Sequence, residues 1–267
     1  MEFEKINIRG VNFANVTMDE TMEIAKSFIA GDKNHAIYTP NAEITQDCIS
    51  DKTGGLFEII NSADMIIPDG SGVILASKIL KTPLKQKVGG YDLGRNHILP
   101  YLDEIGGTLF LLGSKEEFAE KAAANLNGQY KNLKVFYHHG WFDLFGLKNP
   151  EENAEVVEKI NEAKPDVVFV SLGAVGLKQE KWILENKDKV NAKLMIGLGG
   201  TIDIIAGAKK YAPKIFIKLH LEWLYYFIRH PSRIKRFMKL PKFVLGTYSA
   251  RRKIKRDKKR EEKKNKI

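Results

Sequence analysis

The sequence holds a single cysteine, has no long apolar run and lacks a leader-like beginning. With Cys48 alone, no disulfide can form within the chain, which agrees with a reducing cytoplasm. No stretch reaches the roughly 18 consecutive apolar residues typical of a membrane-spanning helix. The first ten residues lack the charged-then-apolar layout of a signal peptide. We therefore expect a cytoplasmic chain that is soluble when made.

Motifs for metals and dinucleotides are also missing from the sequence. There is no Asp-x-Asp, no His-Glu-x-x-His and no cysteine cluster, and His138 and His139 have no evident partners for a zinc site. The chain lacks Gly-x-Gly-x-x-Gly and its following ribose-binding acid, which counts against a dinucleotide-dependent oxidoreductase. We expect neither a metal site nor a cofactor.

The net charge of +10 is concentrated at the carboxyl-terminal end. Residues 207–267 contain 21 Lys and Arg against 4 Asp and Glu, whereas residues 1–206 carry a net charge of −7. A mildly acidic body with a strongly basic end indicates that the end meets a polyanion. Anionic lipid and nucleic acid are the two candidates, and a merely solvated tail is the alternative.

Short apolar runs alternate with helical patterns over the first two hundred residues. Continuous apolar strands separated by helices are typical of a parallel sheet covered on both faces. The predicted fold is therefore α/β, a Rossmann-like, mostly parallel sheet with helices on both faces and a C-terminal helical appendage. The expected strands are 36–38, 63–67, 108–112, 133–137, 167–172 and 193–196.

Three segments are expected in a chain of 267 residues. Residues 1–206 form the α/β core. Residues 207–250 form a helical appendage with an amphipathic face, because aromatic and aliphatic residues recur there at spacings of three and four. Residues 251–267 are almost wholly charged and bury too little apolar area to offset their ordering entropy, so we expect a disordered or marginally helical tail.

Polar and glycine-rich residues directly follow the expected strands. In a parallel sheet the carboxyl ends of the strands meet at one edge, and ligands bind in the loops that begin there. We therefore expect the functional site at this edge. The segments concerned are Thr39-Pro40-Asn41, Pro68-Asp69-Gly70, Gly113-Ser114, Gly140-Trp141-Phe142 and Gly173-Ala174.

Asp69 is a candidate catalytic base. It lies between an apolar strand and a helix start, where a carboxylate can accept a proton from a substrate hydroxyl. An Asp-Gly turn or a helix N-cap explains the residue equally well. Thr39 and Asn41 offer a hydroxyl and a carboxamide on the same edge, which suit the orientation of a sugar, with a capping turn as the alternative.

Other candidate residues concern phosphate and its neutralisation. Gly113 precedes a helix start that could attract phosphate, although the surrounding glycine pattern is incomplete. Gln179 opens a helix beside a glycine-containing loop and could cap that helix or contact a ligand. Arg229, Arg233 and Arg236 form a stripe that could neutralise a diphosphate or contact lipid headgroups.

Seven short markers stand in a fixed order along the chain. They are Thr39-Pro40-Asn41-Ala42-Glu43, Pro68-Asp69-Gly70, Gly90-Tyr91-Asp92, Leu111-Leu112-Gly113, Gly140-Trp141-Phe142, Lys178-Gln179-Glu180 and Glu222-Trp223-Leu224. Together they resemble the WecG/TagA/CpsF glycosyltransferase family, from about Ile6 to about Phe237. The resemblance implies an inverting, metal-independent transfer of N-acetylmannosamine, its uronic acid or a related N-acetylhexosamine from UDP. The implied acceptor is GlcNAc linked by diphosphate to undecaprenol, in the synthesis of teichoic acid or another cell-surface polysaccharide.

The resemblance also implies roles for individual residues. Asp69 is the implied base that deprotonates the acceptor hydroxyl. Thr39 and Asn41, grouped with it as catalytic residues, are implied to position the substrate, as is Gln179. The appendage is implied to dock on the membrane, to close over the site and to bring arginines to the UDP diphosphate. The implied substrate-binding residues are Gln179, Asp92, Gly113, Arg229, Arg233 and Arg236.

Three positions depart from the family pattern. Leu177 stands where a proline usually precedes the Lys/Arg-Gln-Glu marker, and Tyr211 stands where an arginine usually precedes Ala-Pro. Tyr226 stands where an arginine usually follows Glu-Trp-Leu, and Arg229, one turn further on, is the candidate replacement. These departures concern the donor sugar and its diphosphate rather than the fold.

A nucleic-acid-binding protein that acts through its basic tail is the alternative function. Base stacking would need aromatic side chains among the Lys and Arg, and the residues after Arg251 contain none. The aromatic residues lie in the appendage, where they suit a membrane interface. We therefore expect a peripheral protein on the inner face of the bacterial cell membrane. Its expected partners are a UDP-sugar, a lipid-linked acceptor and an anionic membrane surface, without nucleic acid; a homo-oligomer is an open alternative to a monomer.

Overall fold

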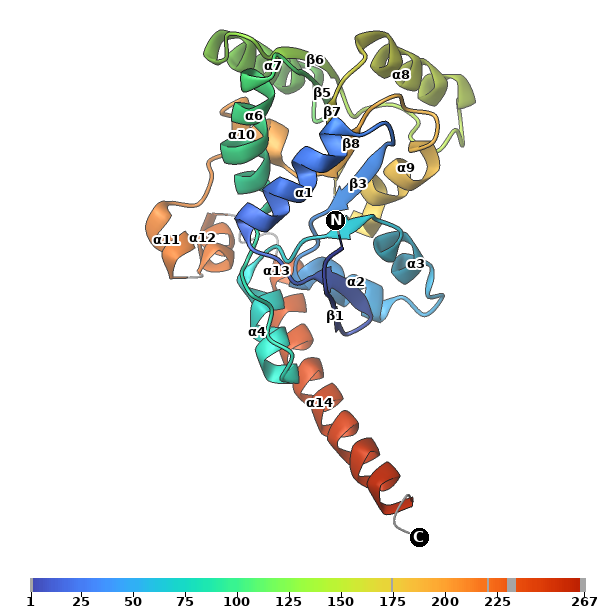
Figure 1. Ribbon diagram of the computed structural model, residues 1–267, viewed down its shortest axis with the longest axis vertical. Helices are drawn as coiled ribbons and strands as arrows, with labels where there is room; N and C mark the ends of the chain where they lie inside the picture. Colours follow the sequence, from blue (N-terminus) through green and yellow to red (C-terminus); the bar gives the residue numbers. More distant parts are fainter. Residues whose placement is uncertain (1, 174, 220, 230–233, 265–267) are drawn as a thin grey trace.

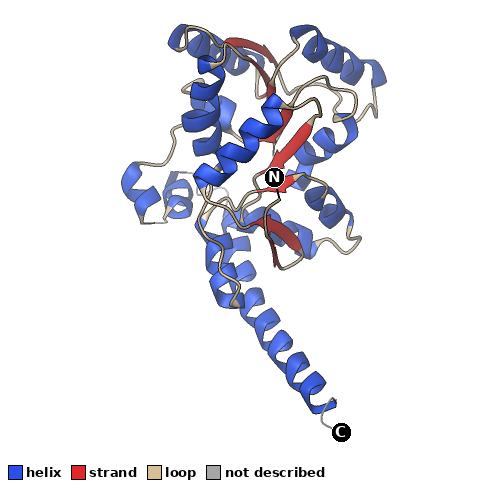
Figure 2. Cartoon of the chain, viewed as in Figure 1, coloured by secondary structure: helices blue, strands red, loops and turns tan. Residues whose placement is uncertain are grey.

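The computed structural model describes residues 2–264 apart from 174, 220 and 230–233. A six-stranded sheet forms the centre of the molecule, with helices packed on both faces (Figures 1 and 2). All its strands are parallel, in the order β4-β3-β8-β7-β5-β6, which confirms the predicted α/β, Rossmann-like sheet. The strands are β3 (His35–Tyr38), β4 (Met65–Ile66), β5 (Thr108–Gly113), β6 (Lys134–His138), β7 (Val167–Ser171) and β8 (Leu194–Gly197).

Alternate side chains of the inner strands enter two separate hydrophobic cores. In β5, Leu109 and Leu111 belong to one core, and Phe110 and Leu112 belong to the other. This follows from the two-residue period of a strand. Because helices cover both faces, the strands are apolar at nearly every position, which is the pattern that the sequence displays.

The helices divide between these two cores. The first core is covered by α1 (Met18–Ala30), α6 (Leu99–Glu104), α7 (Glu116–Gln129) and α10 (Thr201–Ile205). The second core is covered by α2 (Ala42–Ser50), α3 (Gly55–Asn61), α4 (Ser71–Leu80), α8 (Pro150–Ala163) and α9 (Lys178–Asn186).

A short antiparallel hairpin, which the sequence analysis did not predict, lies outside the central sheet. Strands β1 (Lys5–Ile8) and β2 (Val11–Ala14) are joined by Arg9 and Gly10. Both joining residues have positive φ angles, 56° and 100°, as two-residue hairpin turns of the primed type require. An Arg-Gly turn is a weak signal in the sequence because arginine rarely takes this conformation.

A rare helical form follows the marker that contains Asp92. The single turn α5 (Gly90–Asp92) continues into a π-helical segment, η1 (Leu93–Ile98), which leads directly into α6. Single-turn π-helical segments are uncommon and occur frequently at functional sites. The geometry thus singles out the same stretch that the sequence markers do.

The C-terminal segment is helical and is anchored on the core. Its elements are α11 (Lys214–Lys218), α12 (Glu222–Arg229), α13 (Ile234–Phe237) and α14 (Lys239–Lys264). The start of α14 packs against α2 and α4, where Phe243 is 0% exposed and joins the second core. The Arg9 guanidinium donates to the Phe243 carbonyl at 3.4 Å, and the Lys239 ammonium lies 2.7 Å from an Asp47 oxygen.

The charged end continues α14 away from the rest of the molecule (Figure 1). Of the two states expected for residues 251–267, the structure shows the helical one as far as Lys264. The reason is local, because Lys, Arg and Glu have high helix propensity and the residues before them already form a helix. None of the described helices is both long enough and apolar enough to cross a membrane.

Candidate active site at the carboxyl edge of the sheet

The loops after β4, β3 and β8 lie side by side at the carboxyl edge of the sheet. These three strands are neighbours in the strand order. Asp69 follows β4, Thr39 follows β3 and Gly197 ends β8. The parallel arrangement therefore brings together three segments that are separated by up to 158 residues, as in the bond between Thr39 and Gly197.

Asp69 is directed at a backbone amide rather than at its own helix. The N-cap of α4 is Gly70, with a φ of 87°, so Asp69 does not fill the capping position that was its alternative explanation. Its Oδ2 instead accepts a hydrogen bond from the Gly90 amide at 3.3 Å. The carboxyl group is surrounded by protein on most sides and stays partly accessible.

The surroundings of Asp69 favour its protonated form more than water does. Burial, to which the carboxylates of Asp92 and Glu222 add, raises the pKa of Asp69 to about 6 against the opposing effects of the Gly90 amide and Lys87. A carboxyl group of this pKa is largely ionised at neutral pH and is still a stronger proton acceptor than an ordinary aspartate. The electrostatics thus suit a general base.

Thr39 and Asn41 both lie beside Asp69, and both are engaged by the backbone. The buried Thr39 hydroxyl donates to the Gly197 carbonyl at 2.7 Å. The Asn41 Oδ1 accepts from the first amides of α2, at 3.0 and 3.1 Å, so the capping explanation holds for this oxygen. Gly90 packs on Thr39 so closely that a Cβ there would lie 2.9 Å from the Thr39 methyl carbon, while its amide reaches Asp69.

Asp92 connects this edge to the segment after α10. The Tyr211 hydroxyl donates to Asp92 Oδ2 at 3.4 Å, and the Asn96 amide donates to Oδ1 at 3.3 Å. The rings of Tyr91 and Tyr211 are in contact at a tilt of 31°, with centroids 4.1 Å apart. Burial, followed by the nearby carboxylates of Asp92 and Asp69, raises the pKa of Tyr211, so its hydroxyl stays a donor at neutral pH. Tyr211, one of the predicted departures from the family pattern, thus contacts the candidate residue Asp92.

Gln179 neither caps its helix nor points into open space. Its buried side-chain oxygen accepts from the Gly199 amide at 3.0 Å, and its nitrogen donates to Glu180 at 2.7 Å. The N-cap of α9 is Leu177, in the left-handed region with a φ of 55°. The side chain of Gln179 therefore connects α9 to the glycine loop after β8, residues 198–200.

Gly113 does not lie next to Asp69. β5 stands four strands from β4, which corresponds to roughly 19 Å across the sheet. Gly113 has a φ of 136°, and a Cβ there would lie 2.4 Å from the Ser171 carbonyl oxygen. The next hydroxyl, that of Ser114, donates to Asp203, which also pairs with Lys209. The Asp203 carboxylate at this turn would repel a phosphate, which disfavours the predicted phosphate site at Gly113.

The three arginines of the predicted stripe are only partly described. Arg229 ends α12, is exposed, and lies 5.7 Å from the centre of the Tyr225 ring. Arg229 is not among the described groups that shift the pKa of Asp69. Arg233 lies outside the described residues, and Arg236 belongs to α13 with a side chain that is likewise outside them.

Helix α12 reaches the site through other residues, which the sequence analysis missed. Glu222 forms an ion pair with Lys87, two residues before Gly89. Burial raises the pKa of Tyr226 to about 12, and Asp69 and Glu222 add to the effect. Glu222 belongs to the Glu-Trp-Leu marker, which was the available signal, whereas Lys87 has no motif around it.

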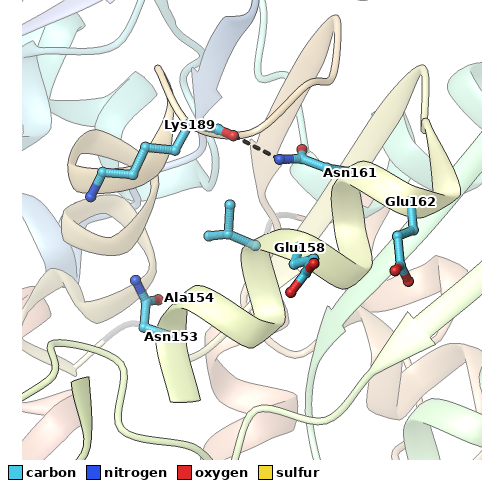
Figure 3. A pocket seen from close by; sticks show the side chains of 7 residues that line it. Asn153, Ala154, Glu158, Asn161, Glu162 and Lys189 are labelled. Carbon is cyan, nitrogen blue, oxygen red and sulfur yellow. Dashed lines mark hydrogen bonds between the residues drawn. The ribbon is translucent and has the colours of Figure 1, made fainter. Parts of the chain in front are cut away.

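Two surface hollows lie outside this cluster. One, of about 390 Å³, is lined by Tyr91, Arg95, Gln129 and neighbouring residues of α7 and α10. The other, of about 600 Å³, is a wide depression along α8, where Asn161 donates to the Lys189 carbonyl at 2.9 Å (Figure 3). Among the described residues, no three His, Cys, Asp or Glu side chains are grouped to hold a metal ion.

An acid of raised pKa at the carboxyl edge of a parallel sheet lies where α/β proteins bind their ligands and where functional groups are often found. The comparisons with known proteins name the reaction class. Residues 6–258 match the model of the Glycosyl transferase WecG/TagA/CpsF family, and the chain belongs to this family and is a glycosyltransferase.

Relatives from Staphylococcus aureus are similar over nearly the whole chain. The protein of strain MRSA252 is 37% identical over 256 residues, which cover 95% of this chain and 96% of the relative. The protein of strain MW2 is 36% identical with the same coverage. Each is named N-acetylglucosaminyldiphosphoundecaprenol N-acetyl-beta-D-mannosaminyltransferase.

Proposed function

We propose that this chain transfers N-acetylmannosamine, or a related N-acetylhexosamine, from UDP to GlcNAc-diphosphoundecaprenol in the synthesis of teichoic acid or another cell-surface polysaccharide. The names of the 36–37% identical relatives support this sugar and this acceptor. The observation that carries the chemistry is the position of Asp69, a partly accessible carboxyl with a pKa raised to about 6 at the carboxyl edge of the sheet.

In this proposal Asp69 is the general base of an inverting displacement. Its carboxylate takes the proton of an acceptor hydroxyl while that oxygen attacks the anomeric carbon of the donor, and UDP leaves from the opposite face of the sugar. The Gly90 amide holds the carboxylate in place from one side. Thr39 fixes the neighbouring backbone, and Asn41 and Asp92 present polar groups to the bound sugars.

The departing diphosphate needs positive charge close by, and the chain can supply it without a metal. Lys87 lies near Asp69 and lowers its pKa, so one ammonium is already within electrostatic reach of the base. The arginines at 229, 233 and 236 are the further proposed partners. Preorganised cations at a leaving group are a strong source of transition-state stabilisation.

We also propose that the appendage docks on an anionic membrane surface at the cytoplasmic face, where a lipid-linked acceptor is found. The segment from α11 to α13 exposes large apolar side chains, while α14 carries the basic end. Apolar side chains next to a basic stretch suit the headgroup region of a bilayer. The exposed apolar residues concerned are Ile215, Leu219, Trp223, Ile228 and Ile234.

The direct test is transfer by the purified chain. UDP-N-acetylmannosamine and a short-chain lipid-diphosphate-GlcNAc are mixed with the protein, and UDP release and the disaccharide product are measured with and without EDTA. The expected result is equal turnover in both conditions with inversion at the anomeric carbon. Turnover that depends on a divalent metal would overturn the metal-independent mechanism, and the absence of product with any UDP-N-acetylhexosamine would overturn the proposed reaction.

A further inference from the structure

We propose that Glu180 is a positioning residue: its carboxylate orients the Gln179 amide, which in turn holds the glycine loop after β8 beside Thr39. The side chain of Glu180 is fully buried and lies away from the accessible edge, so it acts through its neighbour. The kinetic part of this inference rests on the proposed transfer reaction, whereas the structural part does not.

The hydrogen bonding of Glu180 is unusual for a buried acid. One oxygen accepts from the Gln179 amide nitrogen at 2.7 Å. The other oxygen is buried and has no hydrogen-bond partner among the described residues. Burial of a carboxyl group with a single side-chain donor opposes folding, so stability does not explain the residue. Among the described residues, Gln179 is the side chain that donates to this carboxyl group, and the amide of Glu180 itself adds a backbone hydrogen bond.

The direction of the Gln179 amide is set by chemistry at both ends. The Gly199 amide can only donate, so the oxygen of Gln179 must face it, at 3.0 Å. The NH2 group then faces Glu180, and a carboxylate oxygen is the acceptor that this orientation needs. Without an acceptor at position 180, the NH2 group of Gln179 would lose its hydrogen bond. The amide would then be less strongly oriented, and its hydrogen bond with the Gly199 amide would weaken.

The loop that Gln179 holds is packed directly against the candidate active site. A Cβ on Gly197 would lie 2.9 Å from the Gln179 nitrogen, so the amide rests on bare backbone. The carbonyl of Gly197 accepts from the Thr39 hydroxyl at 2.7 Å, and Thr39 packs on Gly90, whose amide binds Asp69. A continuous series of contacts therefore leads from Glu180 to the proposed base.

A double-mutant cycle tests whether Glu180 acts through Gln179. The variants are Glu180→Met, Gln179→Met and both together, with kcat and KM measured for UDP release. Each single change is expected to lower kcat about tenfold or more, because a buried polar group loses its partner. The double variant is expected to lie within about twofold of Gln179→Met. Losses that multiply in the double variant, or an unchanged kcat in Glu180→Met, would overturn the proposal.

Two further variants separate positioning from general damage to the fold. Asn186→Leu removes an equally buried polar side chain from the same helix, whose bonds run to Asn153 and to the Trp182 carbonyl instead. It is expected to lower stability and leave kcat within about twofold. Glu180→Gln keeps an acceptor oxygen and is expected to hold kcat within about threefold of the parent chain. A loss in Glu180→Gln as large as that in Glu180→Met would contradict the proposal.

Nuclear magnetic resonance decides the structural part without any turnover. The side-chain NH2 signal of Gln179 is assigned by its disappearance in Gln179→Met and is then followed in Glu180→Gln, which is nearly the same shape. The signal is expected to shift, because its acceptor changes from a carboxyl to an amide oxygen. An unchanged signal would overturn the link between the two residues, even if the chain proved to transfer a different sugar or none.

Discussion

Lys87 and Glu222 form an ion pair that joins the loop beside Asp69 to helix α12 of the appendage. Their side chains are only 16% and 20% exposed, so the pair is shielded from solvent and salt far more than an ordinary surface pair. The two residues act on Asp69 in opposite directions, since Lys87 lowers its pKa and Glu222 raises it. The position of α12 and the strength of the proposed base are therefore coupled.

Replacement of Asp69 by asparagine should abolish most transfer while the fold is retained. Loss of a general base lowers turnover by about 10²- to 10⁴-fold. UDP release measures the effect, and thermal unfolding checks that the protein is intact. Asp103→Asn is the matched control, because the Asp103 side chain accepts hydrogen bonds from the backbone amides of Asn132 and Leu133, which an asparagine oxygen can also accept. Full activity of Asp69→Asn would exclude the base assignment.

The pH dependence of kcat should report the raised pKa of Asp69. The base is active when ionised, so kcat should rise by about tenfold per pH unit below about 6 and level off above it. A rate–pH profile between pH 4.5 and pH 8 measures this. A flat profile across this range would show that another group, or another step, limits the reaction.

Changes in the ion pair should displace that profile in opposite directions. Glu222→Gln removes an anion that raises the pKa of Asp69, so the midpoint should move to lower pH. Lys87→Met removes a cation that lowers it, so the midpoint should move to higher pH. Displacement of both variants in the same direction would mean that the profile reports a shift in the position of α12 rather than the local field.

The stability of the chain should become less dependent on pH when Glu180 is replaced by glutamine. Burial raises the pKa of Glu180 from 4.5 to about 7, so the folded chain binds this proton more tightly than the unfolded chain does. The free energy of unfolding should therefore fall as pH rises from about 4.5 to 7. In urea titrations at several pH values, Glu180→Gln should reduce this fall in the free energy of unfolding by up to roughly 2–3 kcal/mol. An unchanged slope would show that Glu180 keeps an ordinary pKa.

Phe243 should contribute strongly to folding, although it lies far beyond the α/β core in the sequence. It is fully buried in the second hydrophobic core, so Phe243→Ala should cost about 3–5 kcal/mol in the free energy of unfolding. Leu245→Ala is the control on the same helix, because Leu245 is 70% exposed. Equal and small effects of both changes would show that α14 does not pack on the core in solution. A chain cut after Ala206 would lose Phe243, so loss of activity in such a chain would not isolate the role of the appendage.

A chain that ends at Ala250 tests the basic end more cleanly, since it keeps Phe243 and Thr247 in place. It should stay folded and bind vesicles with phosphatidylglycerol at least about tenfold more weakly, as each removed Lys or Arg contributes roughly 1 kcal/mol near an anionic surface. Duplex DNA at the same salt is the comparison. If the full chain preferred DNA to anionic vesicles, the alternative of a nucleic-acid-binding tail would gain over membrane docking.

The sequence alone determined that the chain forms a parallel sheet, and it places the candidate residues at one edge of that sheet. Continuous apolar runs predict strands that are buried on both faces, and the residues that follow a parallel strand lie at its carboxyl end whatever the order of the strands. For this reason Thr39, Asn41 and Asp69 could be assigned to one edge before the structure was known. The helical start of the appendage followed from its periodicity in the same way.

Only the tertiary structure decided which of these residues meet. The strand order places Gly113 four strands from Asp69, whereas Thr39 follows the strand next to that of Asp69. Nothing local in the sequence encodes that order. The ion pair of Lys87 with Glu222 and the burial of Phe243 join residues more than 100 positions apart. Such contacts are fixed by how whole helices pack over the sheet, because burial of apolar area depends on the complete set of neighbours and not on the residues on either side.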